Sequence, residues 1–306
     1  MIAGPPLTET ELPLKLFARG KVRDTYEISD DRLLMVATDR ISAFDHVLPN
    51  GIPDRGKVLT QLSIFWFSQT HTFQDNHLVS GMVPDLPPAL RDHREQLAGR
   101  FMIVRKAKRI DFECVVRGYL AGSAWKEYEQ SHTLAGDEMP PGMRQSEKLA
   151  YPIFSPATKA ETGHDENVTF AQMKKEIGDD LAAKLRDASL ELYKHASEHA
   201  ERRGIIVADT KFEFGLIDGE PILIDEALTP DSSRFWDATK YVIGTSPESF
   251  DKQFVRDWLE RSGWDKESEP PALPNDIVVQ TRERYLTAYQ RLVGKPLFPP
   301  KPRNER

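Results

Sequence analysis

Charged side chains recur along one short stretch of the chain in a pattern that could hold a ligand or a metal. In DTKFEFG (209–215), strand alternation places Asp209, Lys211 and Glu213 on one face of a predicted strand. A second predicted strand, PILIDE, brings Asp225 back toward the first. Ionised side chains are costly to bury without partners. The pattern therefore predicts a β-hairpin with a charged face that is either solvated or bound to a ligand.

Glu213 and Asp225 are candidate ligands for Mg²⁺, a hard cation that takes carboxylate oxygens together with nucleotide phosphates. Whether the two carboxylates face each other depends on the register of the hairpin. A two-residue turn at Asp218 and Gly219 pairs Glu213 with Ile224, whereas a three-residue loop pairs it with Asp225. The metal hypothesis predicts the longer loop or a bulge, and a charged hairpin without a metal is the alternative.

Side chains suited to anions occur in two further stretches. In RGKVRD, Lys21 and Arg23 lie on the same side of a predicted strand beside Gly20, where the backbone can approach phosphates closely. In TPDSSRFW, Asp231 and Arg234 flank two serines, which suits a polyhydroxylated anion. Exposed charges without a ligand are the alternative for both stretches.

A third candidate anion site lies at a predicted junction between a strand and a helix, ECVVRGYLAGS. Arg117 follows an apolar strand, and Ser123 is the expected N-cap of the next helix. A helix N-terminus beside an arginine suits a phosphate or a carboxylate. An exposed arginine in a turn fits these residues equally well.

Two other matches to known motifs are weaker. GIPDRGKV (51–58) has the glycine and lysine spacing of a phosphate loop, but Val58 replaces the hydroxyl residue that would hold magnesium. HASEH matches a zinc-hydrolase pattern, with His195 and His199 on one helix face. Its strongly charged surroundings indicate a solvated helix. We therefore favour an ordinary loop and an ordinary surface helix.

The elements that must position these residues are a mixture of strands and helices. In the N-terminal half, the residue pattern predicts a β-meander (16–39), a helix (57–70), two strands (100–110 and 112–120), a short helix (123–130) and a long polar loop (137–166). In the C-terminal half, the pattern predicts a helical region that begins with a Thr169–Gln172 capping box, is interrupted near Gly178 and ends at Gly204. Two further helices are predicted at 246–263 and 276–294. Strands followed by mixed elements and flanking helices predict an α+β fold in two lobes.

Composition narrows the class of protein. The 306 residues, 39% of them hydrophobic and 29% charged, are typical of a globular chain of one or two domains. A net charge of −7 without a basic tail disfavours nucleic acid as a partner. The apolar runs are too short to span a bilayer, and the N-terminus lacks a signal-peptide pattern. With a single cysteine, Cys114, these features predict a cytoplasmic protein, either a monomer or a small homo-oligomer.

Five motifs in order along the chain together resemble the SAICAR synthetase (phosphoribosylaminoimidazole-succinocarboxamide synthase) family of purine biosynthesis. They are GKVRDTYE, DRISAFD, ECVVRGYLAGSAWKEY, DTKFEFG and DEALTPDSSRFW, within about residues 17–240. The resemblance implies an antiparallel N-terminal β-lobe at 1–112 and a larger lobe at 113–306. The larger lobe would be similar to ATP-grasp enzymes and carry C-terminal helices, with ATP between the lobes.

The resemblance implies a ligase reaction. ATP, L-aspartate and carboxyaminoimidazole ribotide would give the succinocarboxamide ribotide, ADP and phosphate. The imidazole carboxylate would first be phosphorylated, because an acyl phosphate is a far better electrophile for the aspartate amine. Catalysis would then depend on positioning and charge neutralisation rather than on a covalent nucleophile.

The resemblance also implies roles for individual side chains. The candidate catalytic residues are Lys21, Lys211 and Asp209, of which Lys21 would neutralise phosphate. Mg–ATP would be held by Lys21, Arg23, Glu213 and Asp225, the last two as metal ligands. The ribotide and aspartate would be bound by Arg117, Ser123, Lys159, Asp231, Arg234, Ser42 and Asp45. The charged face of 209–215 would then be the solvated floor of a nucleotide–metal cleft.

Two rival functions use the same residues. A small-molecule kinase on a related two-lobed scaffold would need the lysines and acids but not aspartate. A nucleotide-binding module without catalysis would leave Arg117, Ser123 and Arg234 without a ligand. Dependence of ADP release on L-aspartate separates the ligase from both.

Overall fold

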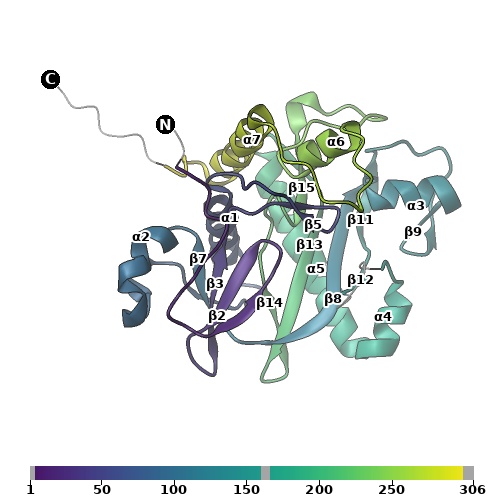
Figure 1. The fold of residues 1–306 in the computed structure, drawn as a ribbon. Coiled ribbons are helices and arrows are strands. Elements are labelled where there is room, and N and C mark those ends of the chain that lie inside the picture. The colour runs from purple at the N-terminus through teal and green to yellow at the C-terminus, as the bar shows by residue number, and fades with distance from the viewer. Residues whose placement is uncertain (1–3, 160–165, 299–306) are drawn as a thin grey trace.

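The computed structural model describes residues 4–159 and 166–298, and the described residues form two large antiparallel sheets and two small two-stranded ones (Figure 1). The N-terminal sheet has five strands in the order β1 (Leu16–Arg19), β2 (Arg23–Glu27), β3 (Arg32–Ala37), β7 (Phe101–Arg105) and β6 (Leu78–Ser80). The expected meander at 16–39 is therefore confirmed. Its middle strand, β3, is rich in apolar side chains, and Leu34 and Val36 are fully buried on one face.

The second sheet has six strands and carries most of the charged stretches. Its central path is β11 (Lys148–Phe154), β8 (Lys108–Tyr119), β13 (Ile205–Ile217) and β14 (Glu220–Ile224), with β12 (Ala157–Thr158) on β8 and β15 (Ser233–Asp237) on β13. The boundary expected between 112 and 113 falls inside β8, all of which belongs to this sheet. The division of the chain into two lobes stays a prediction.

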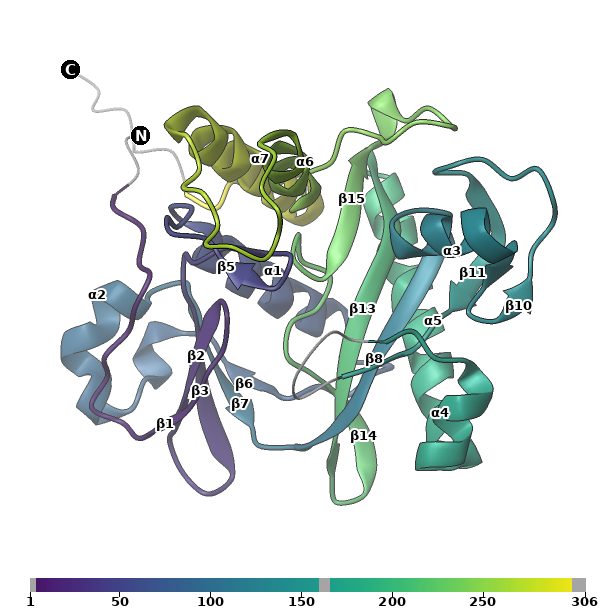
Figure 2. The same ribbon diagram turned by 45° about the vertical axis from the view of Figure 1, so that its right-hand side comes forward.

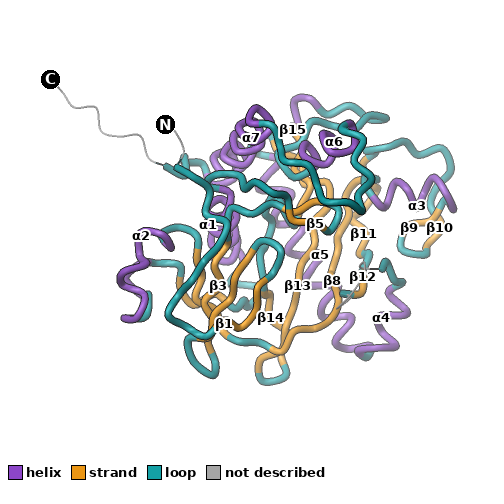
Figure 3. The backbone as a smooth tube through the Cα atoms, in the orientation of Figure 1, coloured by secondary structure: helices purple, strands orange, loops and turns teal. Residues whose placement is uncertain are grey.

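Three long helices build the core that joins the sheets. Helix α1 (Arg55–Thr70) packs on the N-terminal sheet, α5 (Asp179–Glu201) packs on the six-stranded sheet, and α7 (Asn275–Val293) packs on α1. Leu62 and Trp66 of α1, four residues apart, are completely buried against the same core cluster as Leu185 of α5 and Tyr285 of α7. Figure 3 shows the strands in the middle of the molecule with helices around them.

The smaller elements complete the chain. They are β4 (Ser42–Ala43) paired with β5 (His46–Val47), β9 (Thr133–Leu134) paired with β10 (Asp137–Glu138), and the helices α2 (Arg94–Leu97), α3 (Ser123–Ser131), α4 (Phe170–Ile177) and α6 (Gln253–Arg261). Within the described ranges, no helix combines the length and the apolar character needed to cross a membrane. Helices α6 and α7 lie next to each other beside β5 and α1 (Figure 2).

Most of the helices agree with the sequence. Helix α1 and helix α7 lie where the apolar spacing predicts them. Thr169 and Gln172 form the expected capping box of α4, which ends at Gly178, a glycine with a positive φ of 88°. Gly204, with φ 72°, follows the last turn after α5.

Four expectations about secondary structure are wrong. The break expected at residue 111, between strands 100–110 and 112–120, lies at residues 106 and 107, between β7 and β8. The long loop expected at 137–166 contains β11 and β12, which pair with β8 because Leu149 and Phe154 are buried in the sheet. The helix expected from Ser246 begins only at Gln253, because the preceding segment is extended and bridges β15 at Ser249. Ser123 is the first helical residue of α3 rather than its N-cap.

Candidate active site

The charged hairpin adopts the shorter of the two expected turns. Ile217 pairs with Glu220 and Glu213 pairs with Ile224, so only Asp218 and Gly219 lie in the turn. The three-residue loop predicted by the metal hypothesis is therefore wrong. Both turn residues have positive φ, 53° and 84°, as a tight hairpin of this type requires.

Glu213 and Asp225 nevertheless line the same cavity, because Asp225 lies beyond the end of β14. Its φ of 64° is left-handed, so it does not follow the alternation of the strand that precedes it. The two carboxylates are thus brought together by a local backbone reversal rather than by cross-strand pairing. An aspartate adopts this conformation more readily than most residues do.

This cavity, of about 1040 Å³, lies between the two sheets. The predicted residues that line it are Lys21, Arg23, Ser42, Asp45, Lys159, Lys211, Glu213, Asp225 and Asp231. They come from the β1–β2 turn, from the β4–β5 hairpin, from the segment after β12 and from β13 and its neighbours. Segments far apart in sequence therefore converge on one large cavity.

The charged face of β13 is buried, so the expectation of a solvated face is wrong. Asp209 and Glu213 are only 6% and 5% exposed. Their burial is tolerated because each has cationic partners: Glu213 forms an ion pair with Lys159, and Asp209 forms ion pairs with Arg234 and Arg117. Lys211, between them on the strand, forms an ion pair with Glu113 of β8. Burial lowers the pKa of Lys211, but Glu213 and Glu113 outweigh it and raise the pKa above its usual value.

Arg23 clamps the acidic residues that follow β14. Its Nη1 lies 2.8 Å from Asp225 Oδ1, and its Nη2 donates to Asp225 Oδ2 at 2.9 Å and to Glu226 Oε1 at 3.2 Å. Burial opposes ionisation of Asp225, but Arg23, Lys159 and Lys211 hold its pKa below the usual value. Burial together with the charges of Asp231 and Asp225 raises the pKa of Glu226.

Lys21 forms an ion pair with Asp45 at the rim of the large cavity. Both side chains are about half exposed, at 51% and 49%. An exposed pair of this kind is weak and can be exchanged for a stronger ligand at little cost. Lys21 can therefore reach an anion in the cavity.

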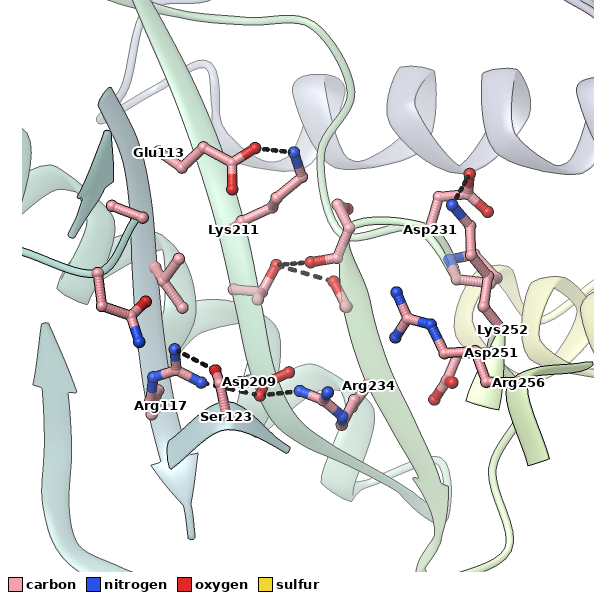
Figure 4. Close-up of a pocket in the computed structure, with 17 residues that line it drawn as sticks. Glu113, Arg117, Ser123, Asp209, Lys211, Asp231, Arg234, Asp251, Lys252 and Arg256 are labelled. Carbon is pink, nitrogen blue, oxygen red and sulfur yellow. Dashed lines mark hydrogen bonds and ion pairs between the residues drawn. The ribbon is translucent and has the colours of Figure 1, made fainter. Parts of the chain in front are cut away.

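A second cavity, of about 350 Å³, is lined by four of the predicted substrate-binding residues, Arg117, Ser123, Asp231 and Arg234 (Figure 4). Arg234 of β15 and Arg117 of β8 both contact Asp209 Oδ2, the latter at 3.5 Å, and Arg117 Nη2 donates to Ser123 Oγ at 3.2 Å. Asp209 lines this cavity and not the larger one. Arg117 is almost fully buried, its Nε has no hydrogen-bond partner among the described residues, and burial lowers its pKa. The cavity thus presents guanidinium groups arranged for an anion.

Asp231 lies where the two cavities meet, and its side chain is only 3% exposed. It forms ion pairs with Arg55 of α1 and with Lys252, the latter at 2.9 Å, and it accepts a hydrogen bond of 3.1 Å from Tyr285. Burial raises the pKa of Asp231, but Arg55 and Lys252 outweigh that effect and lower it. The carboxylate is therefore ionised and saturated by protein partners.

The two cavities form one continuous site. Four residues line both of them, namely Glu113, Lys211, Asp231 and Lys252. A ligand in one cavity therefore lies beside a ligand in the other, with two lysines and two carboxylates at the junction. This arrangement suits transfer of a group between two bound molecules.

Sequence reasoning missed several of the lining residues. They are Glu113, Asn167, Asp251, Lys252 and Arg256. The last three come from DKQFVR, in which a lysine and an arginine are four residues apart and so share one face of the turn that opens α6. That spacing was a usable signal. Asp251, whose pKa burial raises to about 6, accepts hydrogen bonds from the backbone of Phe235 and Gln253.

The two weaker motifs have structural roles. His199 is buried against Trp66, and its Nε2 lies 2.8 Å from the carbonyl oxygen of Leu292, so it is not on a solvated face as expected. Among the residues that the structure describes, no three His, Cys, Asp or Glu side chains form a metal site. The 51–58 segment leads into α1 through Asp54, which has φ 65°.

Comparison with known proteins decides the family. The family model described as SAICAR synthetase matches residues 16–271. The chain belongs to the SAICAR synthetase family. The phosphoribosylaminoimidazole-succinocarboxamide synthase of Elusimicrobium minutum is 51% identical over 288 residues, covering 94% of this chain and 98% of that protein. The same enzyme of Syntrophobacter fumaroxidans is 51% identical over 297 residues, covering 96% and 98%.

Solved structures of this family have the same fold. The Saccharomyces cerevisiae SAICAR synthase complexed with SAICAR matches with a TM-score of 0.87 and 44% identity, covering 95% of this chain and 99% of that one. A SAICAR synthetase in complex with ADP matches with a TM-score of 0.67 and 25% identity, covering 91% and 98%. The α+β fold and the family resemblance are confirmed. The activity is SAICAR synthesis, an ATP-using ligase reaction of de novo purine biosynthesis.

Proposed function

We propose that the large cavity binds Mg–ATP, that the smaller cavity binds carboxyaminoimidazole ribotide, and that the reaction takes place where they meet. The observation that carries this proposal is the set of four residues shared by the two cavities. The relatives solved with ADP and with SAICAR support a nucleotide and a ribotide as the two ligands. L-Aspartate would enter as the third substrate.

In the large cavity, Lys21 and Arg23 neutralise the phosphates of ATP, and Lys211 lies at the junction where the γ-phosphate would be transferred. Glu213 and Asp225 offer hard carboxylate oxygens to Mg²⁺, which supplies Lewis-acid neutralisation of phosphate charge when bound. Two carboxylates suffice, because Mg²⁺ takes its remaining ligands from water and phosphate. The donor set therefore fits the metal.

In the smaller cavity, Arg117, Ser123 and Arg234 bind the phosphate of the ribotide. The unpartnered Nε of the buried Arg117 supports this assignment, because a buried donor without a partner gains from an anionic ligand. Asp209 holds both guanidinium groups in place. Asp231 lines both cavities and is assigned to the imidazole end of the ribotide. Lys159, Ser42 and Asp45 line the large cavity and are assigned to L-aspartate or to the imidazole end, which would react where the cavities meet.

The chemistry proceeds in two balanced steps. An oxygen of the imidazole carboxylate attacks the γ-phosphorus of ATP, which forms an acyl phosphate and releases ADP. The aspartate nitrogen then forms a bond to the acyl carbon, the bond between that carbon and the phosphate oxygen breaks, and phosphate leaves as the amine loses a proton. Positively charged side chains at the junction stabilise the charge that develops on the phosphoryl group.

The acyl phosphate can be tested by isotope transfer. Ribotide labelled with ¹⁸O in its carboxylate is converted by the purified protein with Mg–ATP and L-aspartate, and the released phosphate is analysed by mass spectrometry. The expected result is one ¹⁸O atom in each phosphate, because the carboxylate oxygen leaves with the phosphoryl group. Unlabelled phosphate would rule out the acyl phosphate.

The remaining expectations concern the setting of the enzyme. We expect the enzyme to act in the cytoplasm. We also expect it to be a monomer or a small homo-oligomer, and sedimentation at the protein concentration used for the activity assay measures the number of subunits. A state above four subunits would contradict the expected assembly.

A further inference from the structure

Asp231 is held by side chains from three separate parts of the chain. Arg55 opens α1, Lys252 precedes α6, and Tyr285 lies in the middle of α7. Arg55 and Lys252 both contact Oδ2 of Asp231, whereas the Tyr285 hydroxyl donates to Oδ1 at 3.1 Å. The two carboxylate oxygens thus have different partners, which fixes the orientation of the group.

Helix α7, which supplies Tyr285, lies outside the residues that match the family model, 16–271. It is nevertheless tied to the start of α1, because Arg282 donates to Asp54 Oδ2 from Nε at 3.1 Å and from Nη2 at 2.7 Å. Figure 2 shows α7 beside α1 and α6. The segment beyond the family match therefore reaches the junction of the two cavities.

The hydroxyl of Tyr285 satisfies an oxygen that is buried away from water. The tyrosine is 1% exposed, and burial raises its pKa, so the hydroxyl keeps its proton and can donate. Its ring also packs on the guanidinium of Arg55, with 5.8 Å from the guanidinium carbon to the ring centre. Removal of the hydroxyl alone would leave Oδ1 unsatisfied and the carboxylate free to rotate.

Rotation of the carboxylate would in turn move Lys252. The ammonium of Lys252 lies 2.9 Å from Asp231 Oδ2, and the Lys252 side chain is 15% exposed and lines both cavities. Since effective catalysis depends on groups held in place before reaction, a lysine at this position is sensitive to the orientation of its partner.

We propose that Tyr285 is a positioning residue for the reaction: its hydroxyl orients Asp231 and thereby holds the Lys252 ammonium at the junction of the two cavities. This inference rests on the proposed function, in which the ribotide and ATP meet at that junction. It assigns a role at the active site to the C-terminal helix.

The test compares two conservative variants of the same helix. Tyr285→Phe removes the hydroxyl and keeps the ring on Arg55. Tyr289→Phe is the matched control, because Tyr289 is one turn further along α7, is 5% exposed, and has no side-chain hydrogen bond within the described chain. For each variant we would measure kcat/KM for the ribotide, the Kd of Mg–ATP by calorimetry, and the Tm.

The expected result is a decrease of about tenfold in kcat/KM for the ribotide in Tyr285→Phe, the usual effect of losing a hydrogen bond to a buried charge. The Kd of Mg–ATP should stay within about twofold of wild type, because its phosphates are assigned to Lys21 and Arg23 rather than to Lys252. Tyr289→Phe should match wild type in kcat/KM for the ribotide, in the Kd of Mg–ATP and in Tm. Equal kcat/KM values for the two variants would overturn the inference.

The variant Asp231→Asn separates this inference from the proposed function. If Tyr285 acts through Asp231, Tyr285→Phe should add little in the Asp231→Asn background. If the decreases in kcat/KM of the two single variants multiply in the double variant, the two residues act independently and the inference is overturned. If Asp231→Asn lowers kcat/KM for the ribotide but Tyr285→Phe does not, the inference is also overturned while the proposed function is unaffected. If neither variant changes kcat/KM for the ribotide, the assignment of Asp231 to the active site is wrong as well. Should Asp231→Asn fail to fold, the comparison of Tyr285→Phe with Tyr289→Phe still decides.

Discussion

Lys159 and Glu213 form an ion pair inside the large cavity, linking the segment after β12 to the middle of β13. Lys211 also lies 3.5 Å from the same carboxylate. Glu213 is therefore a partly structural residue that balances two lysines, as well as a candidate metal ligand. Its replacement should affect both the stability of the site and the use of Mg–ATP.

The first prediction concerns Glu213→Gln. The neutral amide keeps the size of the side chain but removes the charge that balances Lys159, so we expect the free energy of unfolding to fall by about 1–3 kcal/mol. Loss of a hard anionic ligand should raise the Mg²⁺ concentration for half-maximal activity at least about tenfold. Chemical denaturation and a magnesium titration of ADP formation measure these two effects.

The matched control for this variant is Glu220→Gln on the same hairpin. Glu220 forms an ion pair with Lys184 at 2.9 Å, but its side chain is 73% exposed and borders neither cavity. We expect this variant to resemble wild type, since exposed ion pairs contribute little. An unchanged magnesium titration in Glu213→Gln would contradict its assignment as a metal ligand.

The second prediction concerns Arg234→Ala. Arg234 lines only the smaller cavity, so its loss should raise the KM of the ribotide about tenfold or more and change the KM of ATP much less. Initial rates with one substrate varied at a time measure both constants. Arg144→Ala, an exposed arginine outside both cavities, is the control. Equal increases for the two substrates would show that Arg234 does not contact the ribotide.

The sequence predicts the elements of this fold better than their exact pairing. Helix α1, the capping box of α4 and the meander follow from apolar spacing and local hydrogen bonds, which act within a few residues. The strand β11 was missed because its exposed Tyr151 and Pro152 hide its alternation, and its burial depends on β8. Pairing between distant segments leaves no local signal.

The same distinction holds for the site. Residue types identified Arg117, Arg234 and Glu213, and the structure brings them to two adjoining cavities. The left-handed backbone of Asp225 could not be predicted, because the metal hypothesis assumed that strand pairing places both carboxylates. Nor could the sequence show that Lys159 neutralises Glu213, since this pair joins β13 to a segment expected to be a loop.

The third prediction concerns the pH dependence of stability. His77 is 3% exposed in the wall of the large cavity, and burial lowers its pKa from 6.5 to about 3. The unfolded chain therefore binds a proton at His77 that the folded chain does not bind, and stability falls as pH decreases below 6.5. At about pH 5 this contribution amounts to about 2 kcal/mol.

Replacement of His77 by a group that does not titrate should remove this part of the acid sensitivity. We expect His77→Gln to lose less free energy of unfolding between about pH 7 and about pH 5 than wild type does, by about 2 kcal/mol. Urea denaturation at several pH values measures the difference. His71→Gln, at an exposed histidine, should follow wild type. Parallel pH curves for His77→Gln and wild type would exclude a buried neutral histidine.

The fourth prediction uses a glycine to displace the Arg234 guanidinium without removing it. A Cβ at Gly122 would overlap the guanidinium nitrogens of Arg234, and the glycine has φ 58°. We expect Gly122→Ala to raise the KM of the ribotide about tenfold while leaving that of ATP nearly unchanged, because the guanidinium must move out of the smaller cavity. Initial-rate kinetics measure both constants.

Backbone strain alone could also impair this variant, and a second glycine separates the two effects. Gly142 has φ 80°, but a Cβ there meets nothing within 4 Å. Gly142→Ala should therefore test a side chain at a positive-φ glycine without a steric clash, and we expect it to lower the Tm and to keep the KM of the ribotide at the wild-type value. If Gly122→Ala and Gly142→Ala have the same KM, the position of the Arg234 guanidinium does not determine ribotide binding.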